Sequence, residues 1–269
     1  GGLGFASGFD EWIVRCGLNS MGSPAEDVVI DNHGNPSTIQ LTLHGKIANT
    51  PAHYVEIEAK PETETIIVKG EVDEAAIFMP GIRLTTAIAT QRQSGKFTIT
   101  DTVTNIMGLE TELELLYHCN YGAPFLEEGS RLEVPIREMA PRDAHATERL
   151  DVAPVYQAPT PGFVEDVFFY ELAGNADNRT MSALINAAGD KAAVLRFDLS
   201  QLPYFTQWKN CAALVDGYVT AMEPCTAFPS RKPDERAAGR VIVLEAGEER
   251  KFELEVETHI GEVAVREVV

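Results

Sequence analysis

Hydrophobic and polar residues alternate along most of the chain, whereas apolar residues at the spacing of a helix are rare. Alternation of this kind is typical of β-strands that bury one face. Because the alternating runs are short and follow one another closely, they predict an all-β fold, a large antiparallel β-sandwich or barrel. The runs occupy residues 39–43, 53–59, 65–69, 83–90, 96–104, 112–116, 164–172, 193–197, 217–222, 239–244 and 251–257.

Turn-forming residues separate these runs, for example at 32–36 and 93–95. Short helices are expected only at 23–28 and 233–237. The Pro-rich stretch at 153–162 is interpreted as a loop, because strand patterns continue on both sides of it. We therefore expect a single β-sandwich domain over residues 1–269.

The composition excludes several classes of protein. Hydrophobic residues make up 44% of the 269 positions, which is enough for a large core and too many for a disordered chain. Lys and Arg number 22 against 41 Asp and Glu, a net charge of −19. Nucleic-acid and anionic membrane surfaces need basic patches, so neither partner is expected. No stretch approaches the roughly 20 apolar residues of a membrane span.

The four cysteines are scattered, with neither a CxxC motif nor metal-ligand spacing. A secreted domain built on disulfides would be shorter and richer in cysteine. We therefore expect reduced thiols and a cytoplasmic protein. The chain starts at Gly1 without an initiator Met or a signal-peptide pattern. That start leaves open a longer protein whose first strands are missing from this sequence.

Two of the six histidines differ from the rest in their sequence surroundings. His44 and His118 each end an apolar strand-like run and precede a bend that contains Gly or Asn. Such strand ends are where rigid scaffolds present catalytic groups. From this pattern alone, a structural histidine with satisfied hydrogen bonds is the better interpretation of either one.

A carboxylate and an aromatic cluster complete the candidate chemistry. Glu223 closes an apolar run and precedes a proline, which favours an extended backbone. Upstream, the segment 204–208 contains three aromatic residues, among them Trp208. Solvation of the carboxylate and ordinary packing of the rings are the simpler interpretations. The functional interpretation is an aromatic platform for a sugar ring beside an acidic group.

The order of these motifs resembles the aldose 1-epimerase (galactose mutarotase) superfamily. Leu-His-Gly at 43–45, Tyr-His-Cys-Asn-Tyr-Gly at 117–122 and Glu-Pro at 223–224 are similar to the motifs that line its sugar site. A branch of bacterial aldose 1-epimerase-like proteins of uncertain function resembles the chain more closely. The matching segments are Arg-Cys-Gly-Leu at 15–18, His-Gly-Lys-Ile-Ala-Asn at 44–49 and Gln-Trp-Lys at 207–209. The similarity covers essentially the whole chain and implies a galactose mutarotase-like supersandwich.

The resemblance implies a role for each matching residue. Glu223 matches the general base that removes the proton of the anomeric hydroxyl. His118 matches the general acid that protonates the ring oxygen, so that the C1–O5 bond opens. His44 matches a substrate-binding histidine, and Arg15 is placed by its spacing at a sugar-binding arginine.

Further residues in the matching segments are expected to bind substrate. Glu165 falls where the family has an aspartate, and Asp166 competes for that role. Asn120, Trp208 and Lys209 belong to the segments that match. Two departures concern the substrate: Cys-Asn at 119–120 replaces the usual Pro-Tyr, and Lys46 stands where many mutarotases have a second glycine.

The implied activity is interconversion of the α and β anomers of an aldose or related sugar. Glu and His, with ordinary pKa values of about 4.3 and 6.5, suit a base and an acid near neutral pH. No cofactor or metal is expected, since this reaction needs neither an electron sink nor a metal. The lack of a metal-ligand cluster and of a Gly-rich phosphate loop in the sequence is consistent with that expectation. Arg15, Lys46 and Lys209 in the matching segments either balance neighbouring carboxylates such as Glu165 and Glu223 or form a local positive pocket for a sugar acid or sugar phosphate. The oligomeric state is left open.

Two other functions remain open at this stage. The first is a carbohydrate-binding protein that keeps the groove without turnover. The second is a polysaccharide lyase-type or hydrolase-accessory sandwich domain, because fold alone does not separate these classes. A hydrolase would need two carboxylates at a defined separation, and only Glu223 has a motif behind it.

Overall fold

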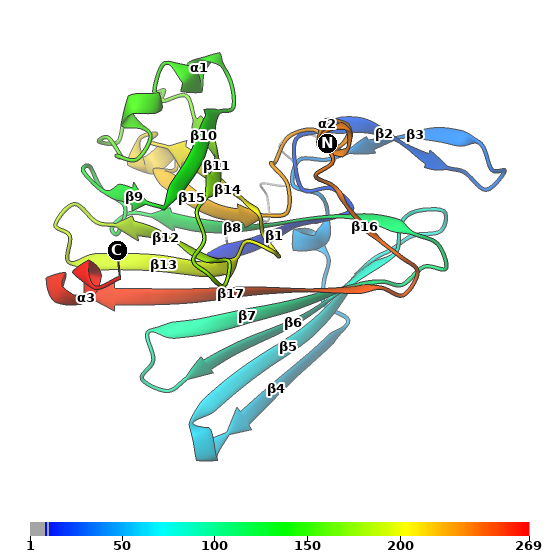
Figure 1. Ribbon diagram of the computed structural model, residues 1–269, viewed down its shortest axis with the longest axis horizontal. Coiled ribbons are helices and arrows are strands. Elements are labelled where there is room, and N and C mark those ends of the chain that lie inside the picture. The colour runs from blue at the N-terminus through cyan, green and yellow to red at the C-terminus, as the bar shows by residue number, and fades with distance from the viewer. Residues whose placement is uncertain (1–8, 10, 269) are drawn as a thin grey trace. The chain divides into compact units, whose positions relative to one another are not determined.

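The computed structural model describes residue 9 and residues 11–268, and its elements are named in Figure 1. Three short α-helices accompany the strands in this part of the chain: α1 (Ala144–Thr147), α2 (Lys232–Ala237) and α3 (Glu262–Arg266). The strands are β1 (Ile13–Leu18), β2 (Ala25–Ile30), β3 (Pro36–Leu41), β4 (Tyr54–Lys60), β5 (Thr65–Glu74), β6 (Ile82–Gln91), β7 (Lys96–Asn105), β8 (Thr111–Gly122), β9 (Arg131–Glu133), β10 (Ile136–Pro141), β11 (Asp166–Leu172), β12 (Arg179–Ile185), β13 (Lys191–Asp198), β14 (Tyr204–Asn210), β15 (Val219–Cys225), β16 (Ile242–Leu244) and β17 (Glu249–Ile260).

Large antiparallel sheets dominate the fold, so the predicted all-β class is confirmed. The chain forms two compact units. Unit 1 contains the described residues up to Arg92 together with Ile99–Tyr117 and Cys225–Glu253. Unit 2 contains Gln93–Thr98, His118–Pro224 and the described residues from Leu254 onward.

Unit 1 is built around an antiparallel ladder in the order β4, β5, β6, which lie side by side in Figure 1. Ten residues of β5 pair with β6, from Thr65 opposite Gln91 to Glu74 opposite Ile82. A separate hairpin joins β2 to β3. Its turn is the one predicted at 32–36: the Asp31 carboxylate accepts hydrogen bonds from the backbone N–H groups of His33 and Asn35.

Unit 2 contains two antiparallel ladders. One has the order β15, β14, β11, β10, with the end of β8 beside β15, and the other has the order β17, β13, β12, β9. Phe205 of β14 stacks on Phe197 of β13, with ring centroids 6.5 Å apart, and meets the edge of Tyr170 at 5.7 Å. These buried rings fill the space between the two ladders, so unit 2 is a β-sandwich.

The helix predicted at 23–28 is wrong, because β2 covers residues 25–30. In β2 the side chains of Ala25 and Asp27 are buried while Glu26 and Val28 are exposed, which is the period of a strand. Pairing with β3 therefore decides the conformation of this segment. The helix predicted at 233–237 is confirmed by α2.

Candidate functional site

The two predicted catalytic residues, His118 and Glu223, contact each other inside unit 2. His118 lies inside β8, which continues to Gly122, so the expectation that this histidine ends a strand is wrong. Glu223 lies near the end of β15, which is the next strand in the sheet. Nε2 of His118 is 3.2 Å from Oε1 of Glu223. Both residues are buried, with relative exposures of 4% for His118 and 2% for Glu223. The sheet therefore holds an imidazole and a carboxyl group, far apart in sequence, at proton-transfer distance.

Burial changes the acidity of Glu223. Loss of solvation raises the pKa of its carboxyl group well above the ordinary value, and the negative charge of Glu165 raises it further. A carboxyl group tuned in this way can accept and release a proton closer to neutral pH than an exposed glutamate. The environment of Glu223 thus suits acid–base chemistry.

Asn120 orients the imidazole. It lies two residues after His118 on β8, so both side chains point to the same face of the strand. Oδ1 of Asn120 is 2.7 Å from Nδ1 of His118. An amide oxygen accepts, so Nδ1 carries a hydrogen and Nε2 is the nitrogen that exchanges a proton with Glu223. Asn120 is therefore a positioning residue for His118.

Trp208 and Glu165 border this pair. The Trp208 ring on β14 lies 5.7 Å from the His118 ring, with a tilt of 55°. Its indole N–H donates to Oε2 of Glu165 over 2.7 Å. The other oxygen of Glu165 pairs with Arg142, also at 2.7 Å. Arg142 thereby fixes the carboxylate that orients the indole.

Arg142 was missed at the sequence level, because it lies in a charged segment that contains no motif.

Asp166, the alternative candidate for the role of Glu165, has a different environment. Asp166 is fully buried, accepts a hydrogen bond from Arg149 over 2.8 Å and lies 3.2 Å from Nε2 of His145. Its contacts are with the Arg149 and His145 side chains, whereas Glu165 contacts Trp208.

Lys209 lies apart from this group. Neighbouring residues of a strand point to opposite faces, so the Lys209 side chain is directed away from the face that carries Trp208. Its ammonium group is buried and donates to the backbone carbonyls of Val152, Ala153 and Val155 at 2.9–3.1 Å. All three N–H donors are thus used within the protein, and loss of solvation lowers the pKa of Lys209 to about 8.

Arg15 and His44 belong to unit 1. Arg15 on β1 pairs with the buried Asp101 at 3.1 Å, and the hydroxyl of Tyr117 donates to the same carboxylate over 2.8 Å. Nδ1 of His44 is 3.1 Å from the carbonyl oxygen of Met21. His44 has a positive φ of 59°, so its segment bends sharply after the apolar run, as the sequence indicated.

The glycine that follows His44 is required by a close approach. A Cβ atom at Gly45 would lie 2.1 Å from the carbonyl oxygen of Ser20 and 2.3 Å from that of Gly17. Its φ of 72° is also in the left-handed region. The Leu-His-Gly motif therefore has a backbone reason for its third residue.

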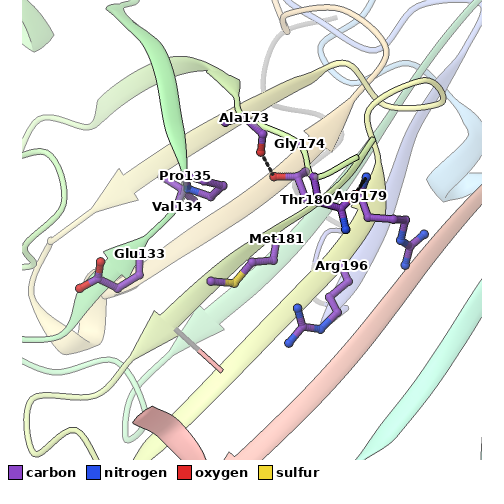
Figure 2. A pocket seen from close by; sticks show the side chains of 10 residues that line it. Glu133, Val134, Pro135, Ala173, Gly174, Arg179, Thr180, Met181 and Arg196 are labelled. Atoms are coloured by element: carbon purple, nitrogen blue, oxygen red, sulfur yellow. Dashed lines mark hydrogen bonds between the residues drawn. The ribbon is translucent and has the colours of Figure 1, made fainter. Parts of the chain in front are cut away.

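A separate cavity of about 510 Å³ in unit 2 contains none of the predicted site residues. Figure 2 shows it bordered by Met181, Arg179 and Arg196, with the Thr180 hydroxyl bonded to the carbonyl of Ala173. Within the part of the chain that the structure describes, no group of three or more His, Cys, Asp or Glu side chains could hold a metal ion. No helix in that part is long and apolar enough to span a membrane.

Solved structures share this fold over nearly the whole chain. A candidate aldose 1-epimerase from Klebsiella pneumoniae is 34% identical, with a TM-score of 0.92, and the match covers 99% of this chain and 67% of that one. A galactose mutarotase-like protein from Clostridium acetobutylicum is 16% identical, with a TM-score of 0.65 and coverage of 92% and 79%. A candidate aldose 1-epimerase from Escherichia coli K12 is 11% identical, with a TM-score of 0.62 and coverage of 93% and 84%.

These likenesses confirm the predicted galactose mutarotase-like fold. They define the chain as a protein of the galactose mutarotase-like class, within which His118 and Glu223 form a buried contact. Residues 1–258 match the family described as Domain of unknown function (DUF4432), and the chain belongs to that family. None of the curated proteins matches it.

Proposed function

We propose that the protein is an aldose 1-epimerase-like isomerase that interconverts the α and β anomers of an aldose or related sugar. The observation that carries this proposal is the buried contact of 3.2 Å between His118 and Glu223. Anomer interconversion needs one proton removed from the hydroxyl on C1 and one delivered to the ring oxygen. A paired carboxylate and imidazolium supply both functions.

In the proposed mechanism, Glu223 begins as the carboxylate and His118 carries a proton on Nε2. Glu223 takes the proton from the C1 hydroxyl while His118 gives its proton to O5, and the C1–O5 bond breaks. The open-chain aldehyde rotates about C1–C2. The same two groups then return the protons in reverse, and the ring closes on the other face of C1.

The pair must hold one proton between its two members for this chemistry. With two protons Glu223 is no longer a base, and with none His118 is no longer an acid. Asn120 favours the productive arrangement, because its bond to Nδ1 leaves Nε2 as the exchanging nitrogen. The pH dependence of turnover then belongs to the pair as a unit.

His118 and Glu223 contact each other directly. In our proposal the sugar's C1–O1 and C1–O5 bonds approach the edge of this pair, and the Trp208 ring borders one side of the sugar. Hydrogen bonding to Glu165 holds the indole in place for stacking.

The test is polarimetry of freshly dissolved α-D-glucose and α-D-galactose with the purified protein. We expect mutarotation faster than in the buffer blank. His118→Asn should lower the rate about 100- to 10,000-fold, the range for loss of a general acid or base. The control variant is His259→Asn, which changes a histidine paired with Glu257 elsewhere in unit 2. Equal rates in the wild type and His118→Asn would refute the assigned role.

A further inference from the structure

Unit 1 contains a cavity of about 410 Å³ that the proposed reaction does not use. It is bordered by Asn19 and Ser20 after β1, by Lys46 of the Leu-His-Gly segment, and by Glu74 and Met79 at the end of β5 and in the loop that follows. Its volume is within the range of sites for small molecules. The five groups come from three separate parts of the sequence.

Ser20 is the first sign of a ligand in this cavity. The residue is only 3% exposed, and its hydroxyl has no hydrogen-bond partner among the described residues. A buried hydroxyl without a partner is costly, because it has lost its water contacts and gained nothing in return. A ligand in the cavity that Ser20 borders can supply the missing bond.

Glu74 is the second sign. Oε2 accepts hydrogen bonds from the backbone N–H groups of Leu18, at 2.6 Å, and Asn19, at 3.5 Å. No partner for Oε1 is found in the described part of the chain. Burial raises the pKa of this carboxyl group, so its neutral form is more populated than in an exposed glutamate. The neutral form can donate a hydrogen bond. The nearest side-chain cations, Lys46 and Lys232, counter that shift only in part.

The charges in the cavity indicate a neutral ligand. Glu74 and Asp73 oppose the single cation Lys46 among the lining residues. Both carboxylate oxygens of Asp73 already accept hydrogen bonds from Arg83, one from Nε at 2.7 Å and one from Nη2 at 2.9 Å. No excess of positive charge is therefore left for a phosphate or carboxylate. A hydroxyl, an amide and a carboxyl group beside apolar side chains such as Met79 match the alternating O–H and C–H groups of a polyhydroxyl compound.

We propose that this cavity is a second binding site, and that its ligand is a neutral polyhydroxyl compound of monosaccharide size. The ligand's hydroxyl groups bond to the Ser20 hydroxyl and to Oε1 of Glu74, and its C–H face packs on Met79. The site does not involve the His118–Glu223 pair, so this proposal and the proposed isomerase activity can be refuted separately.

The test uses protein carrying ¹³C-labelled methionine methyl groups. The Met79 resonance, assigned with Met79→Leu, is followed while D-galactose, D-glucose or sorbitol is added. The two hexoses and the open-chain hexitol distinguish a site for ring sugars from one for any polyol. Met181, which borders the other cavity (Figure 2), is the internal control. We expect a saturable shift of Met79 with at least one of the three compounds and no shift of Met181.

Two variants make the test specific. Ser20→Ala should weaken binding about threefold to tenfold, the usual effect of one hydrogen bond, without lowering the melting temperature, since the hydroxyl has no partner to lose. Glu74→Gln should weaken it as well. A Met79 resonance that stays in place with all three compounds overturns the proposal. So does a shift whose affinity is unchanged in both variants.

The outcome also separates this proposal from the isomerase. In Glu223→Gln the Met79 titration should be the same as in the wild type. A titration that disappears in this variant would overturn the second site. A normal titration in a protein without mutarotase activity would support the second site and refute the proposed function alone.

Discussion

Burying a carboxyl group beside an imidazole is costly for folding, and Glu223 is buried almost completely. No arginine or lysine pairs with it among the described residues, and its pKa is raised by lost solvation and by a second carboxylate, Glu165. Other carboxylates in the same protein form ion pairs with arginine. Asp27 and Glu112, for example, are both bound by Arg236, and their pKa values are lowered. The contrast favours a chemical role for Glu223 over a structural one.

The first prediction concerns the charge of Glu165. In our mechanism Glu223 must be deprotonated, so turnover is lost as the pH falls through its raised pKa. Glu165→Gln removes the nearby negative charge, lowers the pKa of Glu223 and moves the acidic limb of the kcat/KM profile to lower pH. A shift of about half to one pH unit is expected for a charge at this range. The measurement is the mutarotation rate against pH.

Gln keeps an oxygen that accepts the indole N–H, so the variant tests charge more than shape. Glu138→Gln, an exposed position on β10, is the matched control and should leave the profile in place. An acidic limb that stays fixed in Glu165→Gln, or moves to higher pH, would contradict the assignment of Glu223 as the base.

Sequence reasoning found part of this residue-scale arrangement. Glu223 and His118 were selected by motif, and the structure brings them into contact. The pairing of Trp208 with Glu165 joins residues 43 positions apart, and no local pattern reports such a contact. Arg142 was missed for the same reason. The geometry of these groups depends on strand register, which follows from the packing of the whole unit.

At the scale of elements, β14 shows how alternation separates neighbours in the sequence. Trp208 lies on the face that carries His118, whereas Lys209 lies on the face of Gln207, which bonds to Tyr156 and Tyr170. The motif Gln-Trp-Lys suggested one sugar-binding group. In the structure, the Trp208 ring lies beside His118 on one face of β14. The side chains of Gln207 and Lys209 are buried on the other face, where they bond to the loop at 152–156.

A second prediction follows for Lys209. Lys209→Met keeps the length of the side chain but leaves three backbone carbonyls without their donor. We expect a loss of about 2–4 kcal/mol in the free energy of unfolding, as for a small group of buried polar atoms left unpaired. Urea denaturation measures it. Mutarotation per folded molecule should change little, because the ammonium faces away from Trp208.

Lys191→Met, which removes an exposed lysine from β13, is the control for this experiment. A stable Lys209→Met variant that loses its sugar affinity would restore the sequence-based interpretation of Lys209 as a substrate-binding residue.

The positions of strands were easier to predict from the sequence than the residues at which they begin and end. The alternating runs at 65–69 and 112–116 lie inside β5 and β8, which extend to Glu74 and Gly122. β1 and β12 were missed because most of their residues are buried, and a strand buried on both faces has no alternation to recognise. The segment at 23–28 was misassigned because only pairing with β3 reveals its period.

At the scale of the whole molecule, the family and fold were accessible from sequence because the motifs occur in order along the chain. The 34% identity to the Klebsiella pneumoniae protein agrees with that resemblance, and the match spans 67% of that protein. Organisation as a single domain stays a prediction. Alternation and motif order carry little information on how chain segments divide between compact units, and the structure has two such units.

The third prediction concerns the net charge of −19. Such a charge repels anionic ligands at long range, and Lys209, one of the cations considered for an anion site, is buried and fully bonded within the protein. We therefore expect a neutral hexose to be preferred over its uronic acid or 6-phosphate. The preference should narrow as salt is raised, because salt screens long-range charge. Competition experiments at low and high ionic strength measure it. Tighter binding of the 6-phosphate at low salt would contradict the expectation.

The central claim is that the His118–Glu223 pair catalyses anomer exchange, and the direct measurement is magnetisation exchange between the α and β anomeric protons of a sugar at equilibrium. Wild-type protein should transfer magnetisation between the anomers faster than buffer alone. Glu223→Gln, which keeps the shape but removes the base, should lower that rate about 100- to 10,000-fold while the protein stays folded and binds sugar. Exchange at the buffer rate with wild-type protein that binds the sugar, or equal exchange with Glu223→Gln, would contradict the account.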